Sequence, residues 1–293
     1  MATVGCIGVG NMGGPMARHV IEAGHDVRVF DVREEAMEPL VDLGATPTAS
    51  PAEAAAGADA VAIVVLDDRQ FVGVLTGDDG VVASMPAGGI VLAHSTLALA
   101  TVHDMAATCA DAGLGYVDAG ISGGVEGAEA GTLMIIAGGE EAHIDQGRPV
   151  LDAYSTRVVH CGPVGAGICA KLGRNLTGYV MMKAVAEGMA LAARGGVEPA
   201  TFTHILEDSD IMRMYQAAHF GNGAPPEPWD PSRPEHAGFE SFITVGQKDL
   251  HQALVTGNEL GVDLPAARAA LPSLGAIYSI DHPPAPELLE GLD

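Results

Sequence analysis

The chain has 293 residues, of which 48% are hydrophobic and 18% are charged, and this composition indicates a globular protein rather than a disordered one. Its length predicts about two domains. With 14 basic and 38 acidic residues, the formal net charge of −24 argues against binding to nucleic acids or to anionic membrane surfaces.

The four cysteines and eleven histidines are scattered along the chain without a CxxC, HxxxH or HExxH spacing. We therefore expect reduced thiols and no metal site. The first residues lack the basic segment of a signal peptide, and no apolar run reaches the ~18 residues that a membrane span needs. These features predict a cytoplasmic protein.

Short apolar runs alternate with helical patterns over the first 160 residues. Several of these runs are continuous and rich in Val, Ile and Ala, which is typical of strands buried on both faces. Ser50-Pro51-Ala52-Glu53 forms a capping box with proline at the first helical position. The alternation predicts an α/β fold with a doubly wound parallel sheet. Its strands are expected at Thr3–Gly8, Asp26–Asp31, Asp59–Leu66, Gly89–Ser95, Gly115–Ala119, Thr132–Ala137 and Arg157–Cys161.

The pattern changes to purely helical after residue 163. Residues 166–194 are predicted to form one helix that ends at Gly195-Gly196 and, at ~1.5 Å per residue, extends about 40 Å. Such a helix is longer than most helices inside one compact domain, so we expect it to connect two domains. Further helices are predicted at Pro199–Glu207, Phe239–Leu260 and Leu264–Tyr278, with a Pro- and Gly-rich surface loop at 221–238. The predicted parts are a domain 1–163, an interdomain helix 164–195 and an all-α domain 196–293.

A glycine-rich turn, Gly8-Val9-Gly10-Asn11-Met12-Gly13, follows the first predicted strand and opens a helix. In this context GxGxxG is typical of a dinucleotide-binding turn, in which the backbone approaches a pyrophosphate at a helix N-terminus. Asp31 lies 18 residues after Gly13, at the end of the second strand. Its carboxylate would bind the adenine ribose and repel a 2′-phosphate, which predicts NAD as cofactor. Arg33 could serve a 2′-phosphate, so NADP remains open.

The chain has only three lysines, Lys171, Lys183 and Lys248. Lysine, unlike arginine, can lose its proton when it is desolvated. Lys171 lies early in the predicted long helix, and Asn175 follows one turn later on the same face. An amine beside an amide suits acid/base work at a hydroxyl or carbonyl group. The alternative is a lysine whose stem packs at a domain boundary, and Lys183 is predicted to be a surface charge.

A second glycine-rich segment, Asp118–Gly124, follows the fifth apolar run. Ligands of open α/β sheets bind beyond the carboxyl ends of the strands. Ser122 and the N–H groups of Gly123 and Gly124 could hold a carboxylate there without a positive charge. The alternative is a flexible connection to the next strand.

Together these motifs resemble the β-hydroxyacid dehydrogenase family, over nearly the whole chain but more weakly in the last 30 residues. The matching segments are Gly8–Ala17, Asp118–Gly131, Gly165–Asn175 and Lys248-Asp249-Leu250. The resemblance implies an N-terminal Rossmann-type domain, a long interdomain helix, an all-α C-terminal domain and assembly into a homodimer or homotetramer.

The resemblance also implies residue roles. Lys171 matches the catalytic lysine, and Asn175 the amide that holds substrate and lysine. Ser122, Gly123 and Gly124 match the segment that binds the substrate carboxylate, whereas Leu66, Asp67, Thr96 and Lys248 match positions near the cofactor. One departure is Arg174, because the family usually has a second Asn before the position of Asn175.

The predicted function is that of an oxidoreductase that transfers a hydride between NAD and the carbinol carbon of a small 3-hydroxy acid, with Lys171 as general acid/base. One alternative is imine reduction on the same fold, where Asp or Tyr typically replaces Lys171. Another is decarboxylation of a phosphorylated sugar acid, for which the C-terminal part is short and cations are few. A third is a non-catalytic dinucleotide-sensing module.

Overall fold

The computed structural model describes residues 1–209, 237–278 and 281–289. The chain divides into two compact units, residues 1–175 and 176–293, and helix α8 (Ala166–Arg194) runs through the boundary. Each unit is described by itself. Within the described residues, no helix combines the length and apolarity needed to cross a membrane.

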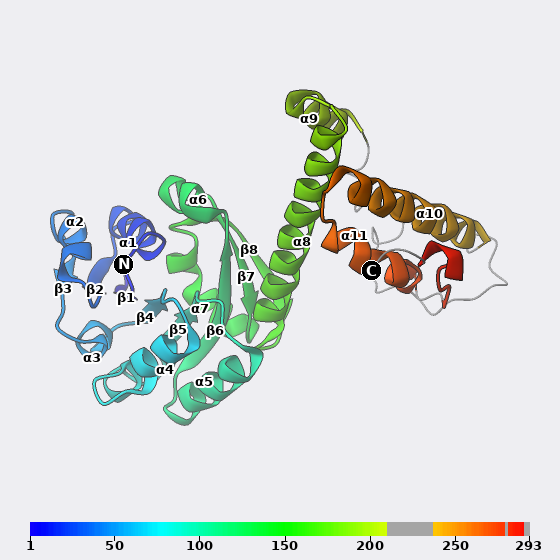
Figure 1. The fold of residues 1–293 in the computed structure, drawn as a ribbon. Helices are drawn as coiled ribbons and strands as arrows, with labels where there is room; N and C mark the ends of the chain where they lie inside the picture. Colours follow the sequence, from blue (N-terminus) through cyan, green and yellow to red (C-terminus); the bar gives the residue numbers. More distant parts are fainter. Residues whose placement is uncertain (210–236, 279–280, 290–293) are drawn as a thin grey trace. The chain divides into compact units, whose positions relative to one another are not determined.

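The first unit contains an eight-stranded sheet in the order β3-β2-β1-β4-β5-β6-β7-β8 (Figure 1). The strands from β3 to β6 are parallel, β7 is antiparallel to β6, and β8 is parallel to β7. Their bounds are Thr3–Ile7 (β1), Asp26–Phe30 (β2), Thr46–Pro47 (β3), Ala60–Ile63 (β4), Ile90–Ala93 (β5), Gly115–Ser122 (β6), Leu133–Gly138 (β7) and Ser155–Gly162 (β8).

The seven predicted strands are all present, and the doubly wound fold is confirmed. The sequence did not predict β3, whose two residues are too short to give a pattern. It also did not predict the antiparallel step from β6 to β7. Only residues 123–132 connect these strands, and a parallel crossover needs a dozen or more residues.

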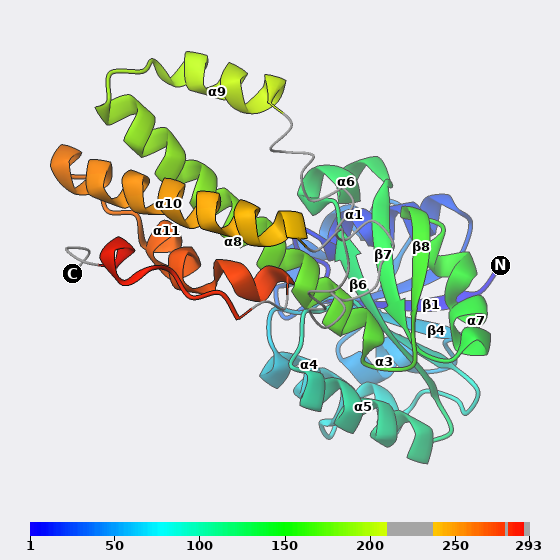
Figure 2. The ribbon, with the colours of Figure 1, turned by 90° about the vertical axis from the view of Figure 1, so that its right-hand side faces the viewer.

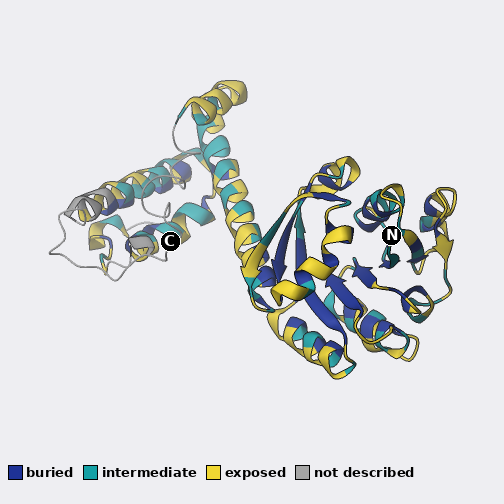
Figure 3. Cartoon of the chain, turned by 180° about the vertical axis from the view of Figure 1, so that it is seen from behind, coloured by how far each residue is buried: buried dark blue, intermediate teal, exposed yellow. Residues whose placement is uncertain are grey.

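Helices cover both faces of the sheet and create two cores. One core includes residues of α1, α2, α6 and α7, and the other includes residues of α3, α4 and α5. Strand β5 serves both, because Ile90 and Leu92 point into the first core and Val91 and Ala93 into the second. Figure 2 shows α1 and α6 on one side of the sheet and α4 and α5 on the other, and Figure 3 shows the buried strands between them. The helices are Gly13–Glu22 (α1), Glu38–Val41 (α2), Pro51–Ala55 (α3), Asp68–Thr76 (α4), Leu99–Asp111 (α5), Gly124–Ala130 (α6) and Glu141–Leu151 (α7).

The predicted capping box at the start of α3 is present. The Oγ of Ser50 accepts a hydrogen bond from the Glu53 N–H at 3.1 Å. The Glu53 carboxylate accepts in return from the Ala49 N–H at 2.8 Å, one residue before the capping position. Local sequence therefore determines where this helix begins.

The second unit is helical in its described residues, with α9 (Pro199–Asp208), α10 (Ala237–Leu260), α11 (Pro265–Ala270) and 3₁₀ helices at Leu271–Tyr278 and Pro286–Leu288. The predicted helix Leu264–Tyr278 changes type after Ala270, because Pro272 has no N–H to continue the α-helical bonding. Glu187 of α8 accepts hydrogen bonds from the N–H groups of Ala266 and Ala267 and so caps α11. Of the predicted loop, residues 221–236 lie outside the described residues, and 237–238 begin α10.

Candidate active site

The turn between β1 and α1 has a backbone that only glycine permits at two positions. Gly8 has φ of +82°, and a Cβ added there would lie 2.2 Å from the carbonyl oxygen of Val64. A Cβ added at Gly13 would lie 1.9 Å from the carbonyl oxygen of Gly8. The N-cap residue of α1, Met12, makes no side-chain capping bond, although the Gly14 N–H already bonds the Gly10 carbonyl at 2.8 Å.

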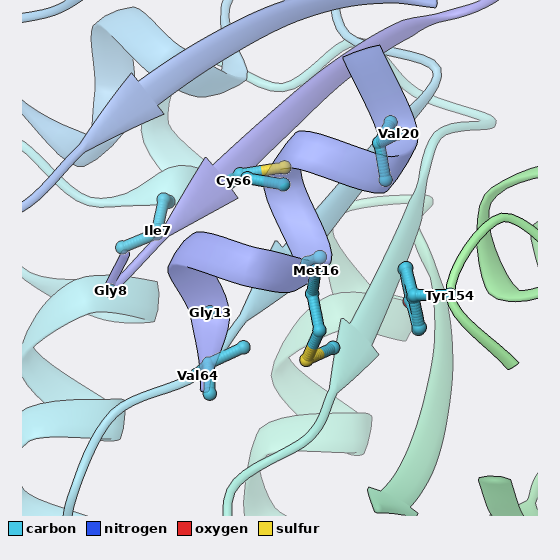
Figure 4. A pocket seen from close by; sticks show the side chains of 10 residues that line it. Cys6, Ile7, Gly8, Gly13, Met16, Val20, Val64 and Tyr154 are labelled. Carbon is cyan, nitrogen blue, oxygen red and sulfur yellow. The ribbon is translucent and has the colours of Figure 1, made fainter. Parts of the chain in front are cut away.

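A small hollow lies behind this turn and is lined mainly by apolar side chains (Figure 4). Cys6, Met16, Val64 and Tyr154 surround it. Burial raises the pKa of the Cys6 thiol to about 12, so this group stays protonated and unreactive at neutral pH. The hollow belongs to the packing that supports the turn rather than to a ligand site.

Gly10 and Asp31 both lie next to the side chain of Arg33. A Cβ added at Gly10 would lie 3.2 Å from Nη2 of Arg33. The Asp31 side chain, 8% exposed at the end of β2, accepts a hydrogen bond from the Arg33 N–H at 3.0 Å and lies 3.5 Å from Nε of Arg33. The structure thus places the predicted ribose-binding carboxylate beside the Gly8–Gly13 turn, with the guanidinium of Arg33 between them.

An acidic hollow of about 870 Å³ adjoins Asp31. The first 3₁₀ helix (Glu34–Ala36) and α2 contribute the carboxylates of Glu34, Glu38 and Asp42, and the strand ends contribute Phe30, Thr48 and Ala49. Four carboxylates therefore line this space, and the sequence analysis had named only Asp31.

The next two strands end in residues predicted to line the cofactor. Leu66 follows β4 and is 84% exposed, and Asp67 caps α4 by accepting from the Gln70 N–H at 2.8 Å. Ser95, just after β5, ties the two strand ends together, because its Oγ bonds both the N–H and the carbonyl of Val65. Thr96 follows it and is exposed. Carboxyl ends of parallel strands share one edge, so these residues lie along the same edge as the turn.

Strand β6 ends at Ser122, where the chain turns sharply into α6. Gly123 has φ of +139°, and Leu133 packs where its Cβ would stand. Gly124 is exposed, with open space where its Cβ would be. The three residues are therefore accessible at the carboxyl end of β6, and the two glycines have a backbone that other residues rarely adopt.

Lys171 reaches this same strand end from α8. Its Nζ donates a hydrogen bond to the carbonyl oxygen of Ile121 at 2.5 Å, and a Cβ at Gly120 would lie 3.1 Å from Cβ and Cγ of Lys171. The residue is 9% exposed. Burial, and then the charge of Arg174, hold the pKa of Lys171 below the ordinary lysine value. The structure thus brings Lys171 to the residue before Ser122.

Asn175, Lys183 and Lys248 each have a polar partner close in the sequence, whereas Lys171 bonds a residue of β6. Oδ1 of Asn175 accepts a hydrogen bond from Nη1 of Arg174 at 3.2 Å. Lys183 is 55% exposed and lies 3.3 Å from the Glu187 carboxylate, as expected for a surface charge. Lys248 lies in the second unit, 59% exposed and 2.8 Å from Asp249, so its role at the cofactor stays a prediction.

No role was predicted for His94, Tyr154 or Asp118, and the structure buries all three side chains. His94 bonds the carbonyl of Ala119 at 2.7 Å and the hydroxyl of Tyr154 at 2.9 Å. Burial lowers the pKa of His94 to about 4, so the ring is neutral at pH 7. Polar residues inside otherwise apolar strands were the signal that could have identified His94 and Asp118. Across the described residues no cluster of His, Cys, Asp or Glu could hold a metal ion.

Comparison with known proteins gives this site its context. Residues 3–162 match the family described as the NAD-binding domain of 6-phosphogluconate dehydrogenase. The chain is 38% identical over 282 residues to an uncharacterized oxidoreductase of Mycobacterium tuberculosis, covering 96% of this chain and 94% of the relative. It is 32% identical over 304 residues to the 3-hydroxyisobutyrate dehydrogenase of Pseudomonas aeruginosa, covering 100% and 96%.

Solved structures that are similar to this chain include proteins of the same kind. The 3-hydroxyisobutyrate dehydrogenase of Mycobacterium tuberculosis, determined with L-serine, matches with a TM-score of 0.67 and 27% identity over 99% of this chain and 97% of that chain. An imine reductase of Myxococcus stipitatus has a TM-score of 0.81 over 97% and 96% of the two chains, but at 16% identity it shows the fold alone. With its dinucleotide turn, its sheet and its full-length relatives, the chain belongs to the β-hydroxyacid dehydrogenase family of NAD(P)-binding oxidoreductases.

Proposed function

We propose that this protein is an NAD-dependent dehydrogenase of a small 3-hydroxy acid, with Lys171 as its general acid/base. The observation that carries the proposal is the position of Lys171, whose Nζ bonds Ile121 directly before Ser122. A buried amine at the carboxyl edge of a Rossmann sheet, with its pKa lowered by burial, is suited to accept and return a proton.

The predicted site residues of the first unit would each have a role in this reaction. Ser122 and the exposed backbone of Gly123 and Gly124 would hold the substrate carboxylate. The neutral amine of Lys171 would take the proton of the hydroxyl group and, in the reverse direction, its ammonium would return that proton to the carbonyl oxygen. A nicotinamide bound along the strand ends would accept the hydride that leaves the carbinol carbon. Asn175, one turn after Lys171, would orient substrate and lysine.

The preference for NAD over NADP is supported by the charges around Asp31. The Gly8–Gly13 turn and the start of α1, which has no side-chain cap, fit a pyrophosphate. An NADP 2′-phosphate beside Asp31 would also face the carboxylates of Glu34, Glu38 and Asp42, against the single guanidinium of Arg33. A ribose with free hydroxyls carries no such charge and can donate hydrogen bonds to Asp31.

The named relatives support the substrate class. Both 3-hydroxyisobutyrate and L-serine carry a hydroxyl group on the third carbon, counted from a carboxylate. A site that places a carboxylate at Ser122 and a hydroxyl at Lys171 would accept this skeleton. The group on the second carbon, which differs between the two compounds, would then determine which acid is preferred.

The test is the formation of reduced nicotinamide, followed by absorbance, with a panel of short 3-hydroxy and 4-hydroxy acids and both cofactors. We expect NAD-linked turnover of at least one 3-hydroxy acid, loss of that turnover in Lys171→Ala and its retention in Lys183→Ala, which removes an exposed lysine from the same helix. Reduction of cyclic imines without turnover of any hydroxy acid would replace the proposal by imine reduction. NAD binding without turnover of either class would favour a sensing module.

A further inference from the structure

Asp118 is a buried carboxylate in the middle of the apolar strand β6. Its Oδ1 accepts a hydrogen bond from the Gly165 N–H at 3.0 Å, and its Oδ2 accepts one from the Ile168 N–H at 2.6 Å. Both N–H groups belong to the start of α8, where a helix has no partners of its own for its first N–H groups. A side chain from the sheet therefore caps α8, in place of a residue next to it in sequence.

The start of α8 also lies against the sheet at backbone distance. A Cβ added at Gly167 would lie 2.4 Å from the nitrogen of Gly138 and 2.5 Å from the carbonyl oxygen of Asp118. A Cβ added at Gly138 would lie 2.6 Å from Oδ1 of Asp118. These contacts leave no room for side chains at the two glycines, so the height of the helix above β6 and β7 is set by the backbones and by Asp118.

The Lys171 side chain also contacts β6. Lys171 comes three residues after Ile168, so it lies on the next turn of α8 and on the same face as the capped N–H. Its stem passes over Gly120, and its Nζ bonds Ile121. Strand β6 therefore contacts α8 at three successive points. Asp118 caps the helix, Gly120 lies against the stem of Lys171, and the carbonyl of Ile121 accepts from its amine.

We propose that Asp118 is a positioning residue, which fixes the start of α8 on β6 and thereby holds the Lys171 side chain over Gly120 and against Ile121. The effect of this position on turnover rests on the acid/base role proposed for Lys171. The position of the Lys171 side chain does not depend on that role.

The charged groups around this contact have distinct effects. Arg174, on α8, is the charge that lowers the pKa of Lys171, after the larger effect of burial. Burial raises the pKa of Asp118, and the hydrogen bonds from Gly165 and Ile168 oppose that rise. A change at Asp118 would therefore reach Lys171 through exposure of the amine rather than through a direct charge effect.

The test compares Asp118→Asn with the unmodified protein by acetylation of lysines with acetic anhydride. Because the chain has only three lysines, mass spectrometry gives the rate for each one across the alkaline range. An asparagine at this position offers one oxygen acceptor and turns its NH₂ toward the second N–H, so one capping bond is lost. Ser50→Ala is the matched control, since it removes a helix cap from α3, which packs on β1, β2 and β4.

In Asp118→Asn we expect the labelling rate of Lys171 to rise several-fold and its pH midpoint to move up toward the ordinary lysine value of about 10.4. The labelling rates of Lys183 and Lys248 should stay unchanged. The same experiment on Ser50→Ala should leave all three lysines as they were. A folded Asp118→Asn protein with an unchanged rate and midpoint at Lys171 would overturn the proposal. Because the labelling uses no substrate, this outcome is independent of the proposed function.

Turnover then separates the two proposals. Raised labelling together with a lower kcat and an unchanged affinity for NAD supports both. Raised labelling with unchanged kcat supports the positioning role and rejects Lys171 as the acid/base. If Asp118→Asn does not fold, Gly120→Ala provides the second arm, because its methyl group would press on the Lys171 stem at 3.1 Å and leave the cap intact. Unchanged labelling of Lys171 in that variant would show that β6 does not hold the lysine.

Discussion

The Nζ atom of Lys171 lies 2.5 Å from the carbonyl oxygen of Ile121, the residue that directly precedes Ser122. This contact joins α8 to the carboxyl end of β6, although the two residues are 50 positions apart in the sequence. It places the only buried lysine of the described residues beside the segment expected to bind a carboxylate.

Replacement of Lys171 by alanine should remove most of the activity. Loss of a general acid/base typically lowers the rate by about 10²- to 10⁴-fold, so we expect kcat to fall in this range while the Kd for NAD stays within a few-fold of its original value. Stopped-flow turnover and fluorescence titration with NAD measure the two quantities. A parallel loss of NAD affinity would instead assign Lys171 to cofactor binding.

The pH dependence should differ between the two reaction directions. Oxidation needs the neutral amine of Lys171, so its kcat should rise with pH, and reduction needs the ammonium, so its kcat should fall through the same midpoint. Burial and Arg174 lower the pKa of this amine, so the midpoint should lie below that of an exposed lysine, about 10.4. Arg174→Gln removes the positive neighbour and should raise the midpoint. A midpoint that does not respond to this change would assign the profile to another group.

Asp31→Ser should weaken the discrimination against NADP. The change removes the carboxylate nearest the ribose and frees the guanidinium of Arg33, which now lies 3.5 Å from Asp31. We expect the ratio of kcat/KM for NAD to that for NADP to fall by at least about tenfold, which corresponds to about 1.4 kcal/mol. The double variant with Glu38→Gln, which removes a second carboxylate of the acidic hollow, should lower the ratio further. If the ratio stays constant in both variants, the 2′-phosphate does not reach this hollow.

Gly13→Ala should abolish NAD binding, because the new Cβ would lie 1.9 Å from the Gly8 carbonyl oxygen and force the turn open. We also expect a loss of stability of about 1–3 kcal/mol from the overlap. Gly73→Ala is the control, since its Cβ would meet nothing within 4 Å in α4 and alanine favours the helix by up to about 1 kcal/mol. Calorimetric titration with NAD and urea unfolding check both variants. Normal NAD affinity in Gly13→Ala would contradict the close approach.

The buried His94–Tyr154 pair should make the protein sensitive to acid. The folded pKa of His94, about 4, lies below the usual value of 6.5, so the unfolded chain takes up the proton first as the pH falls. The free energy of unfolding should therefore decrease by about 3 kcal/mol between pH 6.5 and pH 4, with little further loss from this group below pH 4. Urea unfolding across this range should give a flatter curve for His94→Asn than for the unmodified protein. Replacement of the exposed His204 by glutamine should leave the dependence of the unfolding free energy on pH unchanged. If His94→Asn and the unmodified protein lose stability in parallel as the pH falls, His94 is not the cause of the acid sensitivity.

The sequence by itself determined the features that depend on neighbouring residues. Continuous Val-, Ile- and Ala-rich runs predicted seven of the eight strands, since a strand buried on both faces must be apolar along its whole length. The GxGxxG turn was identified from spacing alone, because a tight turn before a helix leaves little choice of residue, whereas the role of Asp31 at the ribose stays a prediction. The 29-residue helix α8 was predicted with its end at Gly195-Gly196, where Gly196 has φ of +90°.

Tertiary structure decided what depends on contacts between distant segments. Spacing alone left Lys171 between an acid/base and a lysine that packs at a boundary, and only the approach of α8 to β6 gives its Nζ the carbonyl of Ile121. Asp118 carried no local signal of a cap, because the N–H groups it binds come 47 and 50 residues later. Side-chain burial and hydrogen bonding over such separations exist only once the sheet has formed, so a one-dimensional pattern does not contain them.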